Sequence, residues 1–334
     1  MTAGTARTMR AITTSGPGGP EVLTVSERPI PTPGPEDLLV RVRAIGVNRA
    51  DALQRAGRYA PPPDVSDILG LELAGEVSAI GAKVRGFSVG DRVFGLVASG
   101  AYAEFAVVDH GLALPMPAAW DFSTAAAIIE TFCTANETLF TLGRLAAGES
   151  VLIHAGGSGV GTSAIQMAKQ AGAKVYVTTG STEKIQRTTE LGADGGIDYH
   201  RQDFADEIMR LTEGKGVDVV LDFIGASYLP RNIAVLRLKG RLVIAGVMGP
   251  PTHPVDTGPI LGKRLQVLGF TLRPQTIAEK RGIVARFAKR WMPPLATGAL
   301  KPVIHATLPF AKIRDAHRIM EANENFGKLV LTVA

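Results

Sequence analysis

A glycine-rich stretch in the middle of the chain is the first place where residue types and spacing indicate chemistry. The apolar run VLIHA at 151–155 leads into GGSGVG at 156–161 and then into the helical pattern TSAIQMAKQAG. Glycine lets a backbone turn tightly and approach a ligand closely. The first turn of a helix adds free N–H groups and the positive end of a dipole. Such a strand–loop–helix unit suits a pyrophosphate.

The predicted pyrophosphate loop differs from the dinucleotide fingerprint G-x-G-x-x-G at one position, because Ser158 replaces the middle glycine. A glycine-rich turn can be purely structural, so the assignment depends on its place in a strand–helix series. The predicted loop residues are Gly156, Gly157, Ser158, Gly159, Val160 and Gly161.

The end of the next predicted strand indicates which dinucleotide binds. NAD enzymes usually carry an acidic residue there, which binds the ribose hydroxyls. Here Gly180 and Ser181 occupy that place and Lys184 follows within a turn. A small residue, a hydroxyl and a cation leave room for a 2′-phosphate, so we predict NADPH rather than NADH. Lys184 as a solvated lysine at a helix start remains the alternative, and the adjacent Glu183 weakens the signal.

A parallel sheet is needed to hold both loops, and the pattern after residue 150 predicts one. Strands and helices alternate there, which is typical of a doubly wound sheet covered on both faces. The predicted strands are 150–155, 174–179, 195–199, 217–222, 241–245 and 265–269, and the predicted helices are 161–171, 181–191, 204–212 and 227–235. A long helix over 123–142 precedes the series and another over 277–295 follows it.

The first third of the chain reads as β-rich with many turns. Residues 38–44 (LLVRVRA) alternate apolar and polar, as a half-buried strand does. Further strands are predicted at 75–80, 91–96 and 101–108. The C-terminal pattern of strand 303–308, helix 311–323 and strand 327–333 returns to this style. We therefore expect an extension at 1–8, a β-rich domain from 9–131 and 273–334, and an inserted domain at 132–272.

Composition excludes several classes of function. The 334 residues include 36 basic and 31 acidic ones, a net charge of +5 without a basic cluster, so nucleic-acid binding is a poor hypothesis. Cys133 is the single cysteine, which excludes an internal disulfide and fits a reducing compartment. No apolar stretch approaches the roughly 20 residues of a membrane span, and the N-terminus lacks a signal core. We predict a cytoplasmic protein.

Several motifs occur in the order found in one known superfamily. They are GLELAGEVSAIG at 70–81, VGDRVFGL at 89–96, GAYAEFAVV at 100–108 and AAAIIETFCTA at 125–135, together with the glycine loop. The chain thus resembles the medium-chain dehydrogenase/reductase superfamily and, within it, the zinc-free quinone oxidoreductases of the zeta-crystallin group. NRADALQRAGRYAPPP at 48–63, the serine in the glycine loop and MEANENFGKLVL at 320–331 resemble the tumour-suppressor-induced quinone oxidoreductase branch.

The resemblance implies an α/β fold with a GroES-like β-rich catalytic domain and a Rossmann domain with a doubly wound parallel sheet. It implies NADPH in the cleft between them, an acceptor beside the nicotinamide, and a homodimer or tetramer. The implied catalytic residues are Asn48, Asp51 and Tyr59. The implied cofactor contacts, besides both loops, are Thr134, Tyr199, Ala245, Gly246, Val247, Met248 and Asn325.

Two zinc ligands of the zinc-dependent relatives are missing from the matching positions. Those relatives use a cysteine near Asn48 and a histidine in a G-H-E pattern, where this chain reads VNRAD at 47–51 and GLE at 70–72. Because a catalytic zinc takes three protein ligands, we expect no metal.

The sequence therefore predicts an NADPH-dependent, zinc-independent reductase of quinones. Hydride transfer needs only an acceptor held against the nicotinamide. An enoyl or alkenal double-bond reductase is the alternative enzyme. That reaction needs a proton donor, for which Tyr59 is the candidate. The non-enzymatic alternative is an NADPH-binding structural or RNA-binding protein of the crystallin kind.

Overall fold

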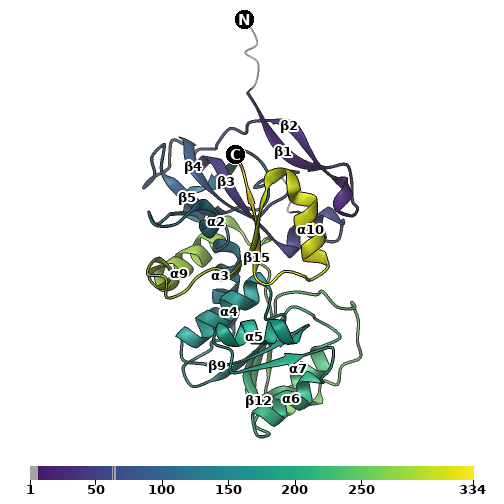
Figure 1. The fold of residues 1–334 in the computed structure, drawn as a ribbon. Helices are drawn as coiled ribbons and strands as arrows, with labels where there is room; N and C mark the ends of the chain where they lie inside the picture. Colours follow the sequence, from purple (N-terminus) through teal and green to yellow (C-terminus); the bar gives the residue numbers. More distant parts are fainter. Residues whose placement is uncertain (1–6, 62, 64) are drawn as a thin grey trace, which may run out of the picture. The chain divides into compact units, whose positions relative to one another are not determined.

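The computed structural model describes residues 7–61, 63 and 65–334 (Figure 1). Contacts divide it into two compact units, unit 1 with Met1–Glu130 and Arg273–Ala334, and unit 2 with Thr131–Leu272. Of the predicted N-terminal extension, residues 1–6 lie outside the described part of the chain. Thr8 already belongs to strand β1 (Thr8–Thr14).

Unit 2 is built on a six-stranded sheet in the order β10-β9-β8-β11-β12-β13. All neighbouring strands are parallel. The chain enters at the centre with β8, winds outward to β10 and returns to β11 beside β8, so the predicted doubly wound fold is confirmed. The strands are β8 (Ser150–Ile153), β9 (Lys174–Thr179), β10 (Gly195–Asp198), β11 (Val217–Asp222), β12 (Leu236–Ile244) and β13 (Gln266–Gly269).

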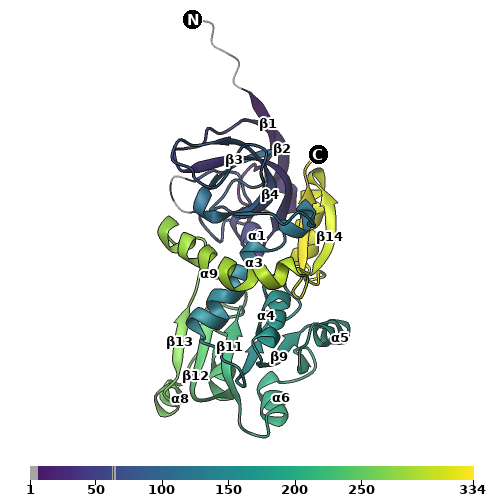
Figure 2. The same ribbon diagram turned by 90° about the vertical axis from the view of Figure 1, so that its left-hand side faces the viewer.

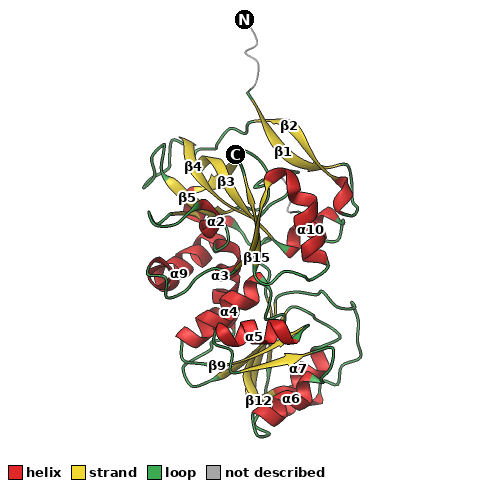
Figure 3. Cartoon of the chain, viewed as in Figure 1, coloured by secondary structure: helices red, strands yellow, loops and turns green. Residues whose placement is uncertain are grey.

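Helices cover this sheet (Figure 3). They are α4 (Gly159–Gln170), α5 (Thr182–Glu190), α6 (Phe204–Leu211), α7 (Leu229–Val235) and α8 (Gly258–Gly262). Phe204 and Ile208 of α6 pack with Leu152 and Val220 from the central strands. Every residue of β8 and β11 is buried, because a parallel sheet covered on both faces leaves its central strands no side open to water.

The single helix predicted at 123–142 is wrong. The chain forms α2 (Phe122–Ala125), then α3 (Ile129–Asn136), then one π-helical stretch over Glu137–Leu142. The Thr138 hydroxyl donates to Thr134 O at 2.7 Å, and Gly143 N–H donates to Thr138 O across five residues. Hydroxyls that bond back to the helix backbone bend helices. No proline marks either interruption in the sequence, so the pattern could not reveal them.

Unit 1 holds a seven-stranded sheet in the order β14-β15-β3-β4-β5-β7, with β6 also paired to β3, and a separate ribbon of β1 and β2. The last strand, β15, pairs antiparallel with β3, so segments from the first third and from the end of the chain build one sheet (Figures 1 and 2). The remaining strands are β2 (Leu23–Pro29), β3 (Asp37–Val47), β4 (Glu72–Ile80), β5 (Arg92–Leu96), β6 (Phe105–Asp109), β7 (Ala113–Pro115), β14 (Ile304–Pro309) and β15 (Lys328–Thr332).

Helices α1 (Arg49–Arg55), α9 (Ile277–Ala296) and α10 (Ile313–Glu321) accompany these strands, together with the short helix α2. The GroES-like β-rich class is confirmed, but the ribbon β1–β2 and helix α1 were not predicted. The strand predicted at 101–108 begins only at Phe105. Residues 101–104 instead make irregular backbone bonds to neighbouring strands, such as Ile12 N–H to Tyr102 O at 2.8 Å.

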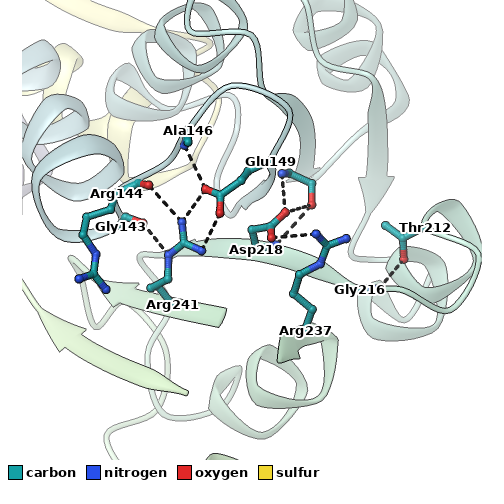
Figure 4. Close-up of polar contacts among 10 residues, drawn as sticks. Gly143, Arg144, Ala146, Glu149, Thr212, Gly216, Asp218, Arg237 and Arg241 are labelled. Carbon is teal, nitrogen blue, oxygen red and sulfur yellow. Dashed lines mark hydrogen bonds and ion pairs between the residues drawn. The ribbon is translucent and has the colours of Figure 1, made fainter. Parts of the chain in front are cut away.

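Ion pairs close the amino ends of the central strands in unit 2 (Figure 4). The Arg241 guanidinium binds both carboxylate oxygens of Glu149, at 3.0 and 2.6 Å, and also donates to Gly143 O and Arg144 O. Nearby, Arg237 donates to Asp218 at 2.8 Å. Ligands bind at the carboxyl ends of such strands, so this cluster at the opposite end serves stability.

Replacing Arg241 with methionine tests that role. The variant leaves Glu149 and two backbone carbonyls without their main donor, and Arg241 is 9% exposed. We expect a loss of about 2–4 kcal/mol in the free energy of unfolding, measured by urea denaturation. Arg237→Met is the matched control. Its side chain is 39% exposed, so we expect about 1 kcal/mol or less. Equal losses in both variants would contradict this assignment.

Candidate functional site

Ser158 begins helix α4 as its N-cap. Its hydroxyl accepts from Gly161 N–H at 3.0 Å, and the helix starts at Gly159, two residues earlier than predicted. Serine is among the best N-cap residues because its side chain satisfies a helix N–H that otherwise lacks a partner. The serine that interrupts the glycine pattern thus stabilises the helix whose first turn faces the predicted pyrophosphate.

The turn ahead of α4 requires close backbone packing. Ala155 has a φ of +53°, in the left-handed region. A Cβ at Gly161 would collide with Ala155 O and would lie 2.7 Å from Gly156 O. Only glycine at position 161 lets the helix approach the end of β8 this closely, which is the role of the third glycine of the fingerprint.

The residues predicted to select the cofactor lie together where β9 and β10 end. Ser181 is the N-cap of α5 and accepts from Lys184 N–H at 3.2 Å. A Cβ at Gly180 would lie 2.6 Å from the Tyr199 hydroxyl. Tyr199 is 38% exposed, and its ring lies 4.5 Å from that of His200. A glycine, a serine and a tyrosine therefore border one edge of the sheet, with Lys184 in the first turn of α5.

The hydroxyl of Thr134 is a buried polar group that could bind a ligand. The residue is 7% exposed, and its hydroxyl has no hydrogen-bond partner within the part of the chain that the structure describes. Nearly all buried polar atoms in folded proteins are hydrogen-bonded. This hydroxyl therefore fits a dinucleotide, whose nicotinamide carries an amide that can bond to it.

The loop after β12 completes the candidate cofactor edge. Ala245 N–H donates to Asp222 O, and Met248 N–H donates to Phe223 O. Val247 is 76% and Met248 44% exposed, so both side chains are available to a ligand. Asp222, which the sequence analysis did not single out, accepts from Ile224 N–H at 2.7 Å and holds the neighbouring turn.

Asn48 begins helix α1 in unit 1 and lies in a buried polar cluster. Its amide donates to Glu72 Oε1 at 3.0 Å and its Oδ1 accepts from Lys328 Nζ at 2.6 Å. Lys328 also pairs with Glu72 at 2.6 Å, and these side chains are 4% and 0% exposed. A Cβ at Gly46 would collide with Glu72 Oε1 and Ala126 O, so glycine is required beside this cluster.

Asp51 lies three residues after Asn48 and is fully buried. Its Oδ2 accepts from Asn48 N–H at 2.8 Å and from the Tyr102 hydroxyl at 3.0 Å, while Oδ1 has no hydrogen-bond partner in the described chain. Burial raises the pKa of Asp51 to about 6, although both hydrogen bonds and the charges of Lys328 and Arg273 oppose the shift. The Tyr102 hydroxyl also lies 3.1 Å from His317 Nε2. Sequence reasoning missed Tyr102.

Tyr59 is half-buried and lies beside a second cation. The Arg273 guanidinium is 5.4 Å from the centroid of the Tyr59 ring. Burial raises the pKa of the Tyr59 hydroxyl, and the charge of Arg273 opposes that shift. Burial, together with the negative charges of Glu72 and Asp51, also raises the pKa of Glu130, against the charge of Lys328. Unit 1 therefore brings the three predicted catalytic residues into one charged region with Arg273 and Glu130.

Two further predictions concern Asn325 and zinc. Asn325 lies in the turn before β15, where its amide donates to Gly327 O at 2.7 Å. Its contact with the cofactor stays a prediction. Within residues 7–61, 63 and 65–334, no group of three or more His, Cys, Asp or Glu side chains is arranged to hold a metal ion. Lys328 already supplies Glu72 with a positive charge. Zinc independence stays a prediction for metal analysis.

Comparison with known families identifies both parts of the chain. The model of the alcohol dehydrogenase GroES-like domain matches residues 34–118, and that of the zinc-binding dehydrogenases matches residues 159–289. The rat quinone oxidoreductase is 33% identical over 327 residues, 97% of each chain. The chain belongs to the medium-chain dehydrogenase/reductase superfamily. The zinc in the second model's description belongs to that family as a whole and does not assign a metal here.

Other proteins match the chain at a comparable level of identity. The human synaptic vesicle membrane protein VAT-1 homolog is 33% identical over 343 residues, 97% of this chain and 86% of that protein. Among solved structures, the Escherichia coli quinone oxidoreductase complexed with NADPH matches with a TM-score of 0.88 and 31% identity, over 97% of this chain and 100% of that one.

Two more solved structures that resemble this chain have other activities in their names. The CurK enoyl reductase matches with a TM-score of 0.87 and 30% identity, over 98% of this chain and 99% of that one. An NAD-dependent alcohol dehydrogenase matches with a TM-score of 0.86 and 34% identity, over 98% and 100%. Proteins of this architecture therefore act on different substrates. None of the described helices has the length and apolar character needed to cross a membrane.

The raised pKa of Asp51 predicts a pH dependence of stability. A carboxyl with an unfolded pKa near 3.9 and a folded pKa of about 6 binds more protons in the folded state between these values. The free energy of unfolding should therefore fall, by about 2–3 kcal/mol, as pH rises from about 4 to 6. Asp51→Asn should remove this part of the slope.

Urea denaturation of the wild type and of Asp51→Asn at pH 4, 5, 6 and 7 measures this pH dependence of the free energy of unfolding. Burial raises the pKa of Asp222 to about 6 as well. Asp222 titrates in both proteins, so the difference between the two curves isolates Asp51. Parallel curves would show that folding does not shift the pKa of Asp51, which would contradict this prediction.

Proposed function

We propose that this chain is an NADPH-dependent oxidoreductase that reduces quinones without a metal. The observation that carries the proposal is the carboxyl edge of the unit 2 sheet. A glycine loop capped by Ser158 meets a helix N-terminus there, and Gly180 and Ser181 stand where NAD enzymes carry an acid. The buried Thr134 hydroxyl lacks a partner in the described chain. The rat and Escherichia coli relatives named above support the quinone as acceptor.

Each cofactor contact has a definite task in this proposal. The first turn of α4 binds the pyrophosphate through its N–H groups, and Ser181 with Lys184 binds the 2′-phosphate. Tyr199 packs against the adenine, while Thr134 and the loop 245–248 hold the nicotinamide. Bound NADPH supplies the hydride, so these residues need only orient it against the acceptor.

The acceptor is proposed to bind at Tyr59 rather than directly at Asn48. Both polar ends of the Asn48 side chain are already engaged, with Glu72 and Lys328, and the residue is 6% exposed. Asn48 is better suited to position helix α1. Tyr59 is half-buried and offers a ring wall and a hydroxyl. Asp51 acts on the nearby Arg273 through its negative charge.

Reduction of an activated double bond is the second candidate. The CurK enoyl reductase shares the architecture at 30% identity, and Tyr59 could donate the proton that such a reduction needs. A binding protein without turnover is the third, since the VAT-1 homolog is as similar to this chain as the quinone oxidoreductases are. A homodimer and a cytoplasmic location stay predictions.

Steady-state oxidation of NADPH separates the three candidates. We expect turnover with 1,4-benzoquinone and 9,10-phenanthrenequinone, little with an α,β-unsaturated ketone, and activity unchanged by EDTA. NADPH oxidation with the ketone alone would favour the double-bond reductase. Tight NADPH binding without turnover of any acceptor would favour the binding protein. Loss of activity together with one zinc per chain would refute metal independence.

Lys184 is the sharpest test of cofactor choice. A hydrogen bond to a charged group contributes about 1.5–3 kcal/mol, and exposure lowers this value. Lys184→Ala should therefore weaken NADPH binding about 10-fold and leave NADH nearly unchanged, as measured by fluorescence titration. Arg187→Ala, one turn further along α5, is the matched control and should change neither. Gly180→Asp is less clean, because its Cβ would meet the Tyr199 hydroxyl. Equal wild-type affinities for both cofactors would contradict the assignment.

A further inference from the structure

The Arg273 side chain is buried with most of its donors unused. The residue is 4% exposed, and its Nε donates to Ala98 O at 2.8 Å. Neither terminal nitrogen has a hydrogen-bond partner in the described part of the chain. An arginine carries five N–H donors and cannot be deprotonated in a protein. The guanidinium therefore holds a full positive charge and an unused pair of donor groups.

Such an arrangement is costly unless something binds to it. Burial of a charge without a partner destabilises a fold far more than a surface charge does. Elsewhere in the molecule buried arginines are paired, as Arg241 is with Glu149 and Arg55 with Glu321. Asp51 acts on Arg273 only through its charge, and no ion pair joins the two within the described residues. A buried group left unsatisfied in this way is expected to have a partner outside the chain, such as a ligand, an ion or a water molecule.

The neighbours of Arg273 indicate where a ligand would lie. The guanidinium faces the Tyr59 ring at 5.4 Å, and Tyr59 is the proposed wall of the acceptor site. Lys280 is a second buried cation, 4% exposed, whose pKa is lowered by burial and by the charge of Arg273. A guanidinium beside Tyr59, with a second cation close enough to act on it through its charge, favours a ligand that carries, or develops, a negative charge on oxygen.

We propose that Arg273 binds the carbonyl oxygen of the acceptor and stabilises the negative charge that reduction places on it. The inference rests on the proposed function, because it assigns a residue to the acceptor of that reaction. The acceptor class is then a carbonyl compound whose reduced form is an oxyanion, such as a phenolate or an enolate.

The step balances without a metal or a further reactant. The C–H bond at C4 of the bound nicotinamide breaks, and its electron pair and hydrogen form a new bond to the acceptor. The acceptor's π electrons move onto the carbonyl oxygen, which becomes an oxyanion beside Arg273. One proton from water then neutralises it. Donors already aimed at the developing charge lower the barrier because they need no reorganisation.

Arg273→Met tests the proposal with a probe that needs no turnover. We would titrate 4-nitrophenol into the protein, with and without NADP⁺, and follow the phenolate absorbance. Wild type should bind the phenolate more tightly than the neutral phenol. The variant should lose about 10- to 100-fold of phenolate affinity, the size of a hydrogen bond to a charged group, and keep affinity for the phenol. The kcat/KM for quinone should fall by a similar factor. Arg273→Lys should restore part of both.

Stability distinguishes this role from a structural one. Removal of an unpaired buried charge should leave the melting temperature of Arg273→Met unchanged or higher. The matched control is Arg281→Met in the same unit. Arg281 is paired with Asp109 and Glu36 at 2.6 and 2.7 Å, so its loss should lower the melting temperature and leave phenolate binding intact.

Two results would overturn the proposal. One is equal phenolate affinity in wild type and Arg273→Met, which includes no binding to either. The other is a lower melting temperature in Arg273→Met with unchanged kcat/KM. Failure of the proposed function looks different. Wild type would then oxidise no NADPH with any quinone, while the phenolate titration would still decide whether Arg273 binds an oxyanion.

Discussion

The packing of unit 1 depends on the contacts that the buried ammonium of Lys328 makes with Glu72 and Asn48. Lys328 belongs to the last strand, donates to Val47 O and Asn48 Oδ1, and pairs with Glu72. Glu72 in turn accepts from Asn48 and from Glu130 N–H. One cation thus fastens β15, β3, β4 and the starts of α1 and α3. A buried pair of this kind adds little net stability, but removal of either partner is strongly destabilising. Its geometry is therefore hard to alter.

This cluster sets the charge around the candidate acceptor site. Lys328 forms its ion pair with Glu72, and no ion pair to Asp51 or Glu130 is found among the described residues. Burial then keeps the pKa values of Asp51 and Glu130 raised. Arg273 is the opposite case, a buried cation whose terminal nitrogens have no hydrogen-bond partner among the described residues. Sites that bind ligands often keep such unsatisfied groups, and the stability lost there is supplied by the rest of the fold.

In unit 2 the constraint is the burial of the central strands, which leaves polar groups no place along them. The central strands of its sheet are buried on both faces, so polar groups gather where these strands begin or end. At the amino ends, ion pairs such as Arg241 with Glu149 close the structure. At the carboxyl ends, Ser158 and Ser181 cap α4 and α5. Side chains there satisfy some helix N–H groups, and the first turns still present the dipole's positive end to an anion.

The sequence alone was sufficient for the parts of this protein that depend on local pattern. Strand–helix alternation predicted the parallel sheet, and the ordered motifs predicted the superfamily. The glycine loop and the acid-free end of β9 could be recognised because each uses residues close together in the chain, and their contacts with the cofactor stay predictions.

Tertiary structure alone decided which distant residues meet. Lys328 and Asn48 are 280 positions apart, and Arg273 and Tyr59 are also remote in the chain, so no periodicity could link them. The break in the helix predicted at 123–142 likewise depends on bonds between side chain and backbone that carry no sequence mark. The physical reason is that local pattern records which face of an element is buried, whereas the charge and partners of a buried side chain are settled only when separate elements pack.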